Sequence, residues 1–207
     1  ADLSKDPAAL QTGRLRKAYA GTLEGDMDLG IRGRVAMVAA GSKGLGRAAA
    51  LALATEGCAV SICGRGAEAL AATRKELEAL GVPVLAMAAD ISSAGDLTRW
   101  HQATESALGP VDILVTNTGG PKAATFDHLD DADWAEGVES TLLSVVRLAR
   151  LVLPGMKARR WGRIVHITSL VAKQPYPLLT ISSTLRAGLS GLTRTLALET
   201  AAEGITV

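Results

Sequence analysis

The sequence predicts an α/β protein in which a doubly wound parallel sheet carries helices on both faces. From Arg34 onwards, short apolar segments alternate with longer segments of helical periodicity, and this alternation is typical of β-α-β units. Right-handed crossovers between parallel strands place the connecting helices on both faces of the sheet. Aromatic residues make up 3% of the chain, so Ala, Leu and Val must form most of the core.

Strands and helices are expected to follow one another in strict alternation. The expected strands are residues 35–39, 59–63, 84–87, 112–116, 163–168 and 205–207. The expected helices run from the glycine-rich loop at 41–46 to residue 56, and over residues 67–80, 94–108, 131–159 and 182–202. The strands are short and apolar, as strands buried on both faces of a parallel sheet require. Because the last strand begins just before Val207, we expect the sheet to continue past that residue.

Residues 1–32 are set apart from this pattern by their charged residues, glycines and Pro7. A short helix from about Pro7 to Tyr19 is expected, since Leu10, Leu15 and Ala18 share one helical face. Two interpretations of this segment stay open: a flexible leader, and an arm that packs on a partner subunit. Residues 33–207 then form a single domain.

Composition and charge exclude several classes of function. The net charge is +1, which gives no electrostatic footprint for nucleic acid. No segment approaches the run of about 20 apolar residues that crosses a membrane, and the N-terminus has no signal-peptide pattern. Cys58 and Cys63 lie in apolar surroundings and are expected to be reduced core thiols. A cytoplasmic protein is therefore expected.

A glycine-rich loop follows the first expected strand and opens a helix. Its residues are Gly41, Ser42, Lys43, Gly44, Leu45 and Gly46. Gly41 is expected to make the tight turn, Gly44 to admit a phosphate to the backbone N–H groups, and Gly46 to let the helix pack closely on the sheet. The unpaired N–H groups and the dipole of a helix N-terminus favour an anion. The loop therefore predicts a dinucleotide-binding site.

With Ala40 in front of it, this loop resembles the cofactor signature of the short-chain dehydrogenase/reductase family. The segments Asp90-Ile91, Asn117-Thr118-Gly119-Gly120 and Thr168-Ser169 follow in the family's order. The resemblance covers residues 34–207 and implies a Rossmann-type fold. It implies that Asp90 and Ile91 contact adenine, that Asn117 and Gly119 line the cofactor, and that Ser169 is the catalytic serine.

The end of the second strand decides which nicotinamide cofactor is expected. An NAD site usually offers a carboxylate there to the ribose 2′-OH, but this chain has Cys63-Gly64-Arg65. Arg65 can instead make a charge-assisted contact with a 2′-phosphate, and Lys43 is a second cation nearby. The alternative is that both are ordinary solvated charges. We expect NADP(H) as the cofactor.

Other catalytic positions depart from the family pattern. The resemblance places Ser182 at the usual tyrosine, Arg186 at the usual lysine and Thr141 at the usual asparagine. A tyrosine phenol has a pKa of about 10 that a cation can lower, whereas an aliphatic hydroxyl is a far weaker acid. Arg186 can hold a ribose or a phosphate but does not give up a proton. Ser182 and Arg186 thus suit binding better than standard acid catalysis.

Tyr176, between two prolines seven residues after Ser169, is a candidate substitute acid; the alternative is a packing residue beside the substrate. His166 is expected to point away from Ser169 and to be a satisfied structural histidine, because side chains alternate along a strand. His101 and His128 are expected at the surface. No cluster of His, Cys and Asp has metal-ligand spacing, so no metal is expected.

The residues around Asn117 and Ser182 resemble a divergent branch similar to 3-oxoacyl-carrier-protein reductases. This resemblance implies an oxidoreductase that acts on a small-molecule or carrier-bound carbonyl substrate. It also implies a homodimer or homotetramer, with the helices at 131–159 and 182–202 at the interface. The alternative is a cofactor-binding scaffold or regulator without redox turnover. A third class, elimination or cyclisation, has no positive support in the sequence.

Overall fold

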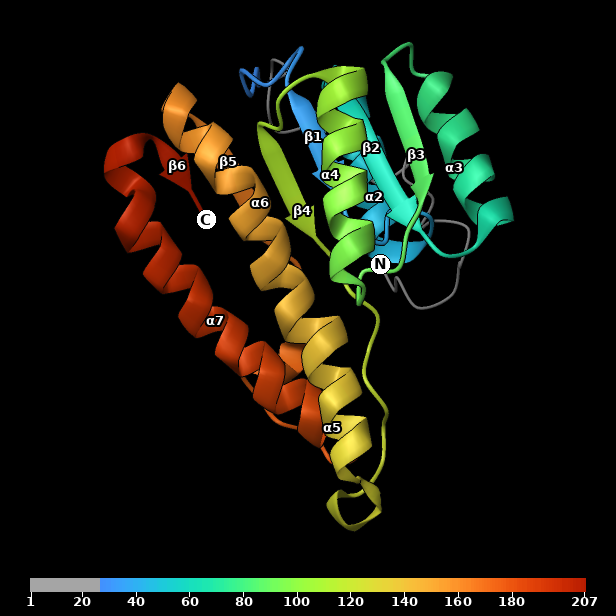
Figure 1. Cartoon of the computed structure of the whole chain (residues 1–207), viewed down its shortest axis with the longest axis vertical. Coiled ribbons are helices and arrows are strands. Elements are labelled where there is room, and N and C mark those ends of the chain that lie inside the picture. The colour runs from blue at the N-terminus through green and yellow to red at the C-terminus, as the bar shows by residue number, and fades with distance from the viewer. Residues whose placement is uncertain (1–26) are drawn as a thin grey trace, which may run out of the picture. The chain divides into compact units, whose positions relative to one another are not determined.

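Six parallel strands form one sheet in the computed structural model, which describes residues 27–207. The strands are β1 (Val35–Val38), β2 (Ala59–Gly64), β3 (Val84–Ala88), β4 (Ile113–Thr116), β5 (Gly162–His166) and β6 (Ile205–Thr206). Their order is β3-β2-β1-β4-β5-β6 (Figure 1). The order reverses between β1 and β4, and such a switch point opens a crevice at the carboxyl ends of the strands. The predicted doubly wound α/β fold is confirmed. The helix expected at Pro7–Tyr19 lies outside the described residues.

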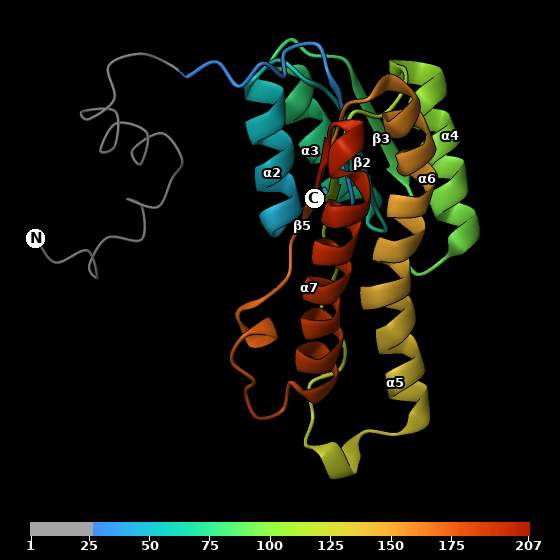
Figure 2. The same ribbon diagram turned by 90° about the vertical axis from the view of Figure 1, so that its left-hand side faces the viewer.

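Helices cover both faces of the sheet (Figure 2). They are α2 (Gly44–Thr55), α3 (Ala67–Glu78), α4 (Ala94–Leu108), α5 (Asp131–Gly137), α6 (Ser144–Arg159) and α7 (Thr180–Thr200). On one face, Met37 and Leu114 of the sheet pack with Trp100 of α4 and Leu148 of α6. On the other face, Val38 and Ile62 pack with side chains of α2 and α3. Successive residues of β1 thus point into opposite cores, which explains why the strand is apolar throughout.

The long helix expected at 131–159 is present, but its middle is a π-helical segment, η3 (Val138–Leu143). The preceding Gly137 allows a close approach of α5 to α7, because a Cβ atom there would lie 2.5 Å from the side chain of Ile181. Periodicity alone does not reveal this segment. Most other boundaries differ by one or two residues; for example, β5 ends at His166 rather than residue 168, and α7 begins at Thr180 rather than Ser182.

Buried titratable side chains bear on several expectations. Cys58 and Cys63 are buried free thiols, as predicted, and burial raises the pKa of Cys58 to about 11 and that of Cys63 to about 12. The surface position expected for His101 is wrong: this side chain is buried on α4, and burial lowers its pKa. Within residues 27–207, no helix is long and apolar enough to cross a membrane.

Candidate functional site

A groove of about 630 Å³ opens at the switch point between β1 and β4. The loops that follow β1, β2, β3 and β4 form its walls. Eight of the predicted cofactor residues line it: Ser42, Lys43, Gly44, Leu45, Arg65, Ile91, Asn117 and Gly119. Because the carboxyl ends of parallel strands meet at one edge of a sheet, residues far apart in the sequence converge there.

The tight turn out of β1 spans residues 39–42 and includes Gly41, as expected. Its left-handed residue is Ala40, with a φ of +47°, a conformation that normally favours glycine. Gly41 is needed for space, because a Cβ atom there would lie 2.7 Å from the Ile62 side chain of the neighbouring strand.

Gly46 packs against Ala40 and Asn117, two residues that line the groove. A Cβ atom on Gly46 would lie 2.3 Å from the carbonyl oxygen of Ala40 and 2.8 Å from Nδ2 of Asn117. The Asn117 amide in turn donates to the Ala40 carbonyl oxygen at 3.4 Å. The end of the β1 loop at Ala40, the first turn of α2 at Gly46 and the Asn117 side chain are thus in close contact. This agrees with the expected close packing of α2 at Gly46.

The N-terminus of α2 faces this groove with no side-chain cap. Lys43 is the residue before the helix, and its side chain caps no backbone N–H group; the first turn carries no acidic residue. The loop itself is fixed from behind, since Thr73 donates to the carbonyl oxygen of Ser42 at 3.0 Å. Unpaired N–H groups at a rigid helix N-terminus suit a phosphate.

Two exposed cations, Lys43 and Arg65, border the same groove. Neither forms an ion pair with another residue of the described chain. Arg65 follows β2, where a carboxylate would face a ribose hydroxyl in an NAD site. Both side chains are therefore available to an anionic group in the groove.

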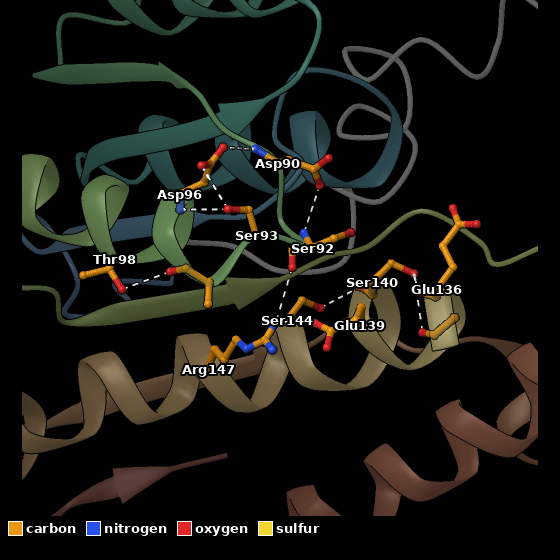
Figure 3. A network of polar contacts seen from close by, with 12 residues as sticks. Asp90, Ser92, Ser93, Asp96, Thr98, Glu136, Glu139, Ser140, Ser144 and Arg147 are labelled. Atoms are coloured by element: carbon orange, nitrogen blue, oxygen red, sulfur yellow. Dashed lines mark hydrogen bonds and ion pairs between the residues drawn. The ribbon is translucent and has the colours of Figure 1, made fainter. Parts of the chain in front are cut away.

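Asp90 supports the groove from outside rather than lining it. Its backbone N–H donates to Asp96 at 2.9 Å, and its carboxylate accepts from the backbone N–H of Ser92 at 2.9 Å (Figure 3). Arg147 of α6 contacts the Ser92 carbonyl oxygen and the Glu139 carboxylate in the same network (Figure 3). This turn sets the position of Ile91, which does line the groove.

The predicted catalytic residues lie on the β5–α7 side. Ser169 is exposed at the end of β5, and its Oγ atom accepts from the backbone N–H of Val171 at 3.4 Å. Ser182 and Arg186 are buried on α7, one helical turn apart. Arg186 donates to the carbonyl oxygen of Thr168, the residue before Ser169, at 3.1 Å. Burial lowers the pKa of Arg186.

Tyr176 lies in a different pocket. This pocket has a volume of about 380 Å³, and its lining includes Tyr176, Lys173, Ser183 and Thr184 but neither Ser169 nor Ser182. The Tyr176 side chain is 69% exposed. No hydrogen bond among the described residues connects its hydroxyl group to Ser169.

Two buried polar side chains near the site are incompletely satisfied. His166 shares a 2.7 Å hydrogen bond between its Nδ1 atom and Thr116 Oγ1, but its buried Nε2 atom has no partner among the described residues. The expectation of a fully satisfied histidine is thus wrong, and burial lowers the His166 pKa to about 4. Thr141 is fully buried in η3, and its hydroxyl group lacks a partner within the described chain. Residues 27–207 contain no group of His, Cys, Asp and Glu that could hold a metal ion.

Sequence reasoning missed Ala40 and Thr118. Thr118 lines the groove and accepts from Arg186 at 3.3 Å. The available signal was its place between Asn117 and Gly119, two residues after the end of β4. Ala40 lies likewise two residues after the end of β1.

Comparisons with known proteins identify the family of this chain. The model of the short chain dehydrogenase family matches residues 34–207. A putative ketoacyl reductase of Streptomyces coelicolor is 38% identical and covers 84% of this chain and 67% of its own length. A 3-oxoacyl-[acyl-carrier-protein] reductase of Pseudomonas aeruginosa is 35% identical, covering 86% of this chain and 72% of its own.

Two solved structures extend the comparison. L-sorbose reductase from Gluconobacter frateurii, in complex with NADPH and L-sorbose, has a TM-score of 0.83 at 34% identity and covers 86% of this chain and 68% of that one. An NADPH-bound short chain oxidoreductase from Pseudomonas aeruginosa, described as containing an atypical catalytic center, has a TM-score of 0.79 at 35% identity, covering 84% and 68%. With the family match over residues 34–207, these relatives show that the chain belongs to the short-chain dehydrogenase family of oxidoreductases.

Proposed function

We propose that this protein uses NADPH to transfer a hydride between the nicotinamide and a carbonyl or alcohol carbon of a small-molecule or carrier-bound substrate. The observation that carries the proposal is the groove at the switch point, with its uncapped helix N-terminus and two cations that form no ion pair within residues 27–207. The NADPH complexes of two structural relatives support the choice of cofactor.

The residues of the groove fit the parts of such a cofactor. The N–H groups at the start of α2 would hold the pyrophosphate, and the cradle is tight because a Cβ atom on Gly46 would collide with Ala40. Arg65 and Lys43 would pair with the 2′-phosphate. Ile91 would border the adenine, and Asn117 and Gly119 the nicotinamide half. When bound, the cofactor supplies or accepts the hydride.

Ser169 is the residue proposed to polarise the substrate oxygen, because it is an exposed residue in the segment that follows β5. Reduction of a carbonyl to an alcohol consumes one hydride and one proton. Ser182 is a poor source of that proton near neutral pH, since an aliphatic hydroxyl is a weak acid. Water, the substrate itself or Tyr176 would supply it.

A second candidate is an NADPH-binding protein without ordinary redox turnover. The observation that favours it concerns Tyr176, the tyrosine of residues 27–207: it lines another pocket and is not among the residues of the groove. In this case the groove would bind NADPH as tightly as in the first candidate function, and the protein would act as a scaffold or regulator.

One experiment separates the two candidates. NADPH oxidation is followed with a panel of ketones for the wild-type chain, Ser169→Ala and a control, Ser106→Ala, at an exposed position of α4. The oxidoreductase proposal expects turnover that the first variant loses and the control keeps. NADPH binding without turnover across the panel would favour the second candidate, and absence of NADPH binding would exclude both.

The exposed face of α7 supports a homo-oligomer. The exposed residues of its first three turns are small, namely Thr184, Ala187, Gly188 and Gly191, whereas its last turns expose Arg194, Thr195, Leu198 and Glu199. Small residues let two helices approach closely. Gly191→Arg should therefore reduce the assembly to a smaller species in size-exclusion chromatography with light scattering, and an unchanged mass would argue against this face.

A further inference from the structure

Arg186 joins the ends of two neighbouring strands. Its Nη1 atom donates to the carbonyl oxygens of Ile167 at 3.2 Å and Thr168 at 3.1 Å, just after β5. Its Nη2 atom donates to Thr118 Oγ1 at 3.3 Å and to the carbonyl oxygen of Gly119 at 3.2 Å, just after β4. Each terminal nitrogen of a guanidinium carries two N–H groups, so these contacts occupy all four.

The hydrogen-bond acceptors around Arg186 explain how its permanent charge can be buried. Arg186 is 6% exposed, and none of its acceptors is a carboxylate. A buried cation persists only where its donors are hydrogen-bonded. The planar, fixed fork of arginine can reach two segments at once, whereas the lysine ammonium is a compact point charge. The contact set therefore requires arginine in particular.

We infer that Arg186 is a positioning residue that fixes the end of β5, and with it Ser169, relative to the Thr118–Gly119 wall of the groove. Its terminal N–H groups are committed to the protein, so it neither binds the ribose through them nor carries the catalytic proton. This differs from the cofactor-binding and catalytic role expected for Arg186 by resemblance. The inference rests on the proposed function only where NADPH enters its test.

The main test compares Arg186→Lys with Arg194→Lys, an exposed arginine on the same helix. Loss of the fork should lower the melting temperature of the cofactor-free protein by roughly 4–8 °C, a shift of the size that a few hydrogen bonds produce in a domain of this length. It should also weaken NADPH binding at least about tenfold, while R194K changes neither quantity. If R186K keeps the wild-type melting temperature and NADPH affinity, the inference is wrong.

A double-mutant cycle provides a readout that general destabilisation would not move. Thr118→Val removes the one side-chain acceptor of Arg186. Residues in contact give non-additive effects, so T118V should weaken NADPH binding a few-fold in the wild-type chain and hardly at all in R186K. Equal effects in both backgrounds contradict the inference.

Two further outcomes are decisive. If the protein does not bind NADPH, the proposed function fails. A lower melting temperature of cofactor-free R186K, beside an unchanged melting temperature of R194K, would still support the positioning role of Arg186. If R186K does not fold, T118V alone decides: the inference requires a lower melting temperature for this variant, and an unchanged value overturns it.

Discussion

Gly46 and Ala40 touch through the backbone alone: a Cβ atom on Gly46 would lie 2.3 Å from the Ala40 carbonyl oxygen. This contact brings the first turn of α2 onto the end of β1 and leaves the N–H groups of the loop facing the groove. The proposed cofactor site depends on this approach more than on any side chain.

We therefore expect Gly46→Ala to be strongly damaging. The added methyl group must displace the backbone, at a cost of about 1–3 kcal/mol, and NADPH affinity should fall by at least tenfold. Urea unfolding and NADPH fluorescence titration measure the two effects. Gly95→Ala is the matched control, because a Cβ atom there would lie 3.6 Å from its nearest neighbour, the Arg99 side chain. Equal losses of stability and NADPH affinity in the two variants would show that the close approach is unimportant.

Ala40→Gly should not destabilise the protein as Gly46→Ala does. A left-handed conformation costs a non-glycine residue about 1–2 kcal/mol, and glycine relieves this strain at an entropic cost of about 0.5–1 kcal/mol. The free energy of unfolding should therefore stay level or rise slightly. Ala48→Gly, at an exposed position of α2, should instead lose about 1 kcal/mol. A similar loss in both variants would contradict the prediction.

Cys58 and Cys63 should be unreactive in the native protein. Burial raises both thiol pKa values, to about 11 and about 12, and only the thiolate is nucleophilic. We expect no labelling by a thiol-specific disulfide reagent at pH 8, and labelling of both cysteines once urea unfolds the chain. Rapid labelling of the native protein would show that these thiols are accessible.

Acid should destabilise the protein through His166. Its pKa falls to about 4 on folding, against about 6.5 in an unfolded chain. The unfolded state therefore binds the proton first, and stability is lost as the pH falls from about 6.5 to about 4, by up to about 3 kcal/mol. Below pH 4 this contribution no longer changes.

His166→Asn should flatten that dependence in urea unfolding measured at several pH values. A residual slope should remain, because burial also lowers the pKa of His101. His128→Asn, at an exposed position, should keep the wild-type slope. If the His166 variant keeps it as well, the acid sensitivity has another origin.

Much of the fold could be predicted because strands buried on both faces are apolar throughout. Most groove residues could be predicted because they lie in the loops that follow the strands. The positive φ of Ala40 could not be predicted, since alanine rarely adopts a left-handed conformation. The hydrogen-bond partners of Arg186 could not be predicted from the sequence either. Three of its four acceptors are backbone carbonyl groups, and they lie 18, 19 and 67 residues away in the sequence.

The most direct test of the account is the ratio of the dissociation constants for NADPH and NADH, measured by titration calorimetry on the wild-type chain and on Arg65→Ser. The groove with its two bordering cations predicts that NADPH binds at least about tenfold more tightly, since a charge-assisted contact is worth about 1.5–3 kcal/mol. Arg65→Ser should remove most of that preference and leave NADH binding unchanged. Equal affinities for the two cofactors in the wild-type chain would contradict the account.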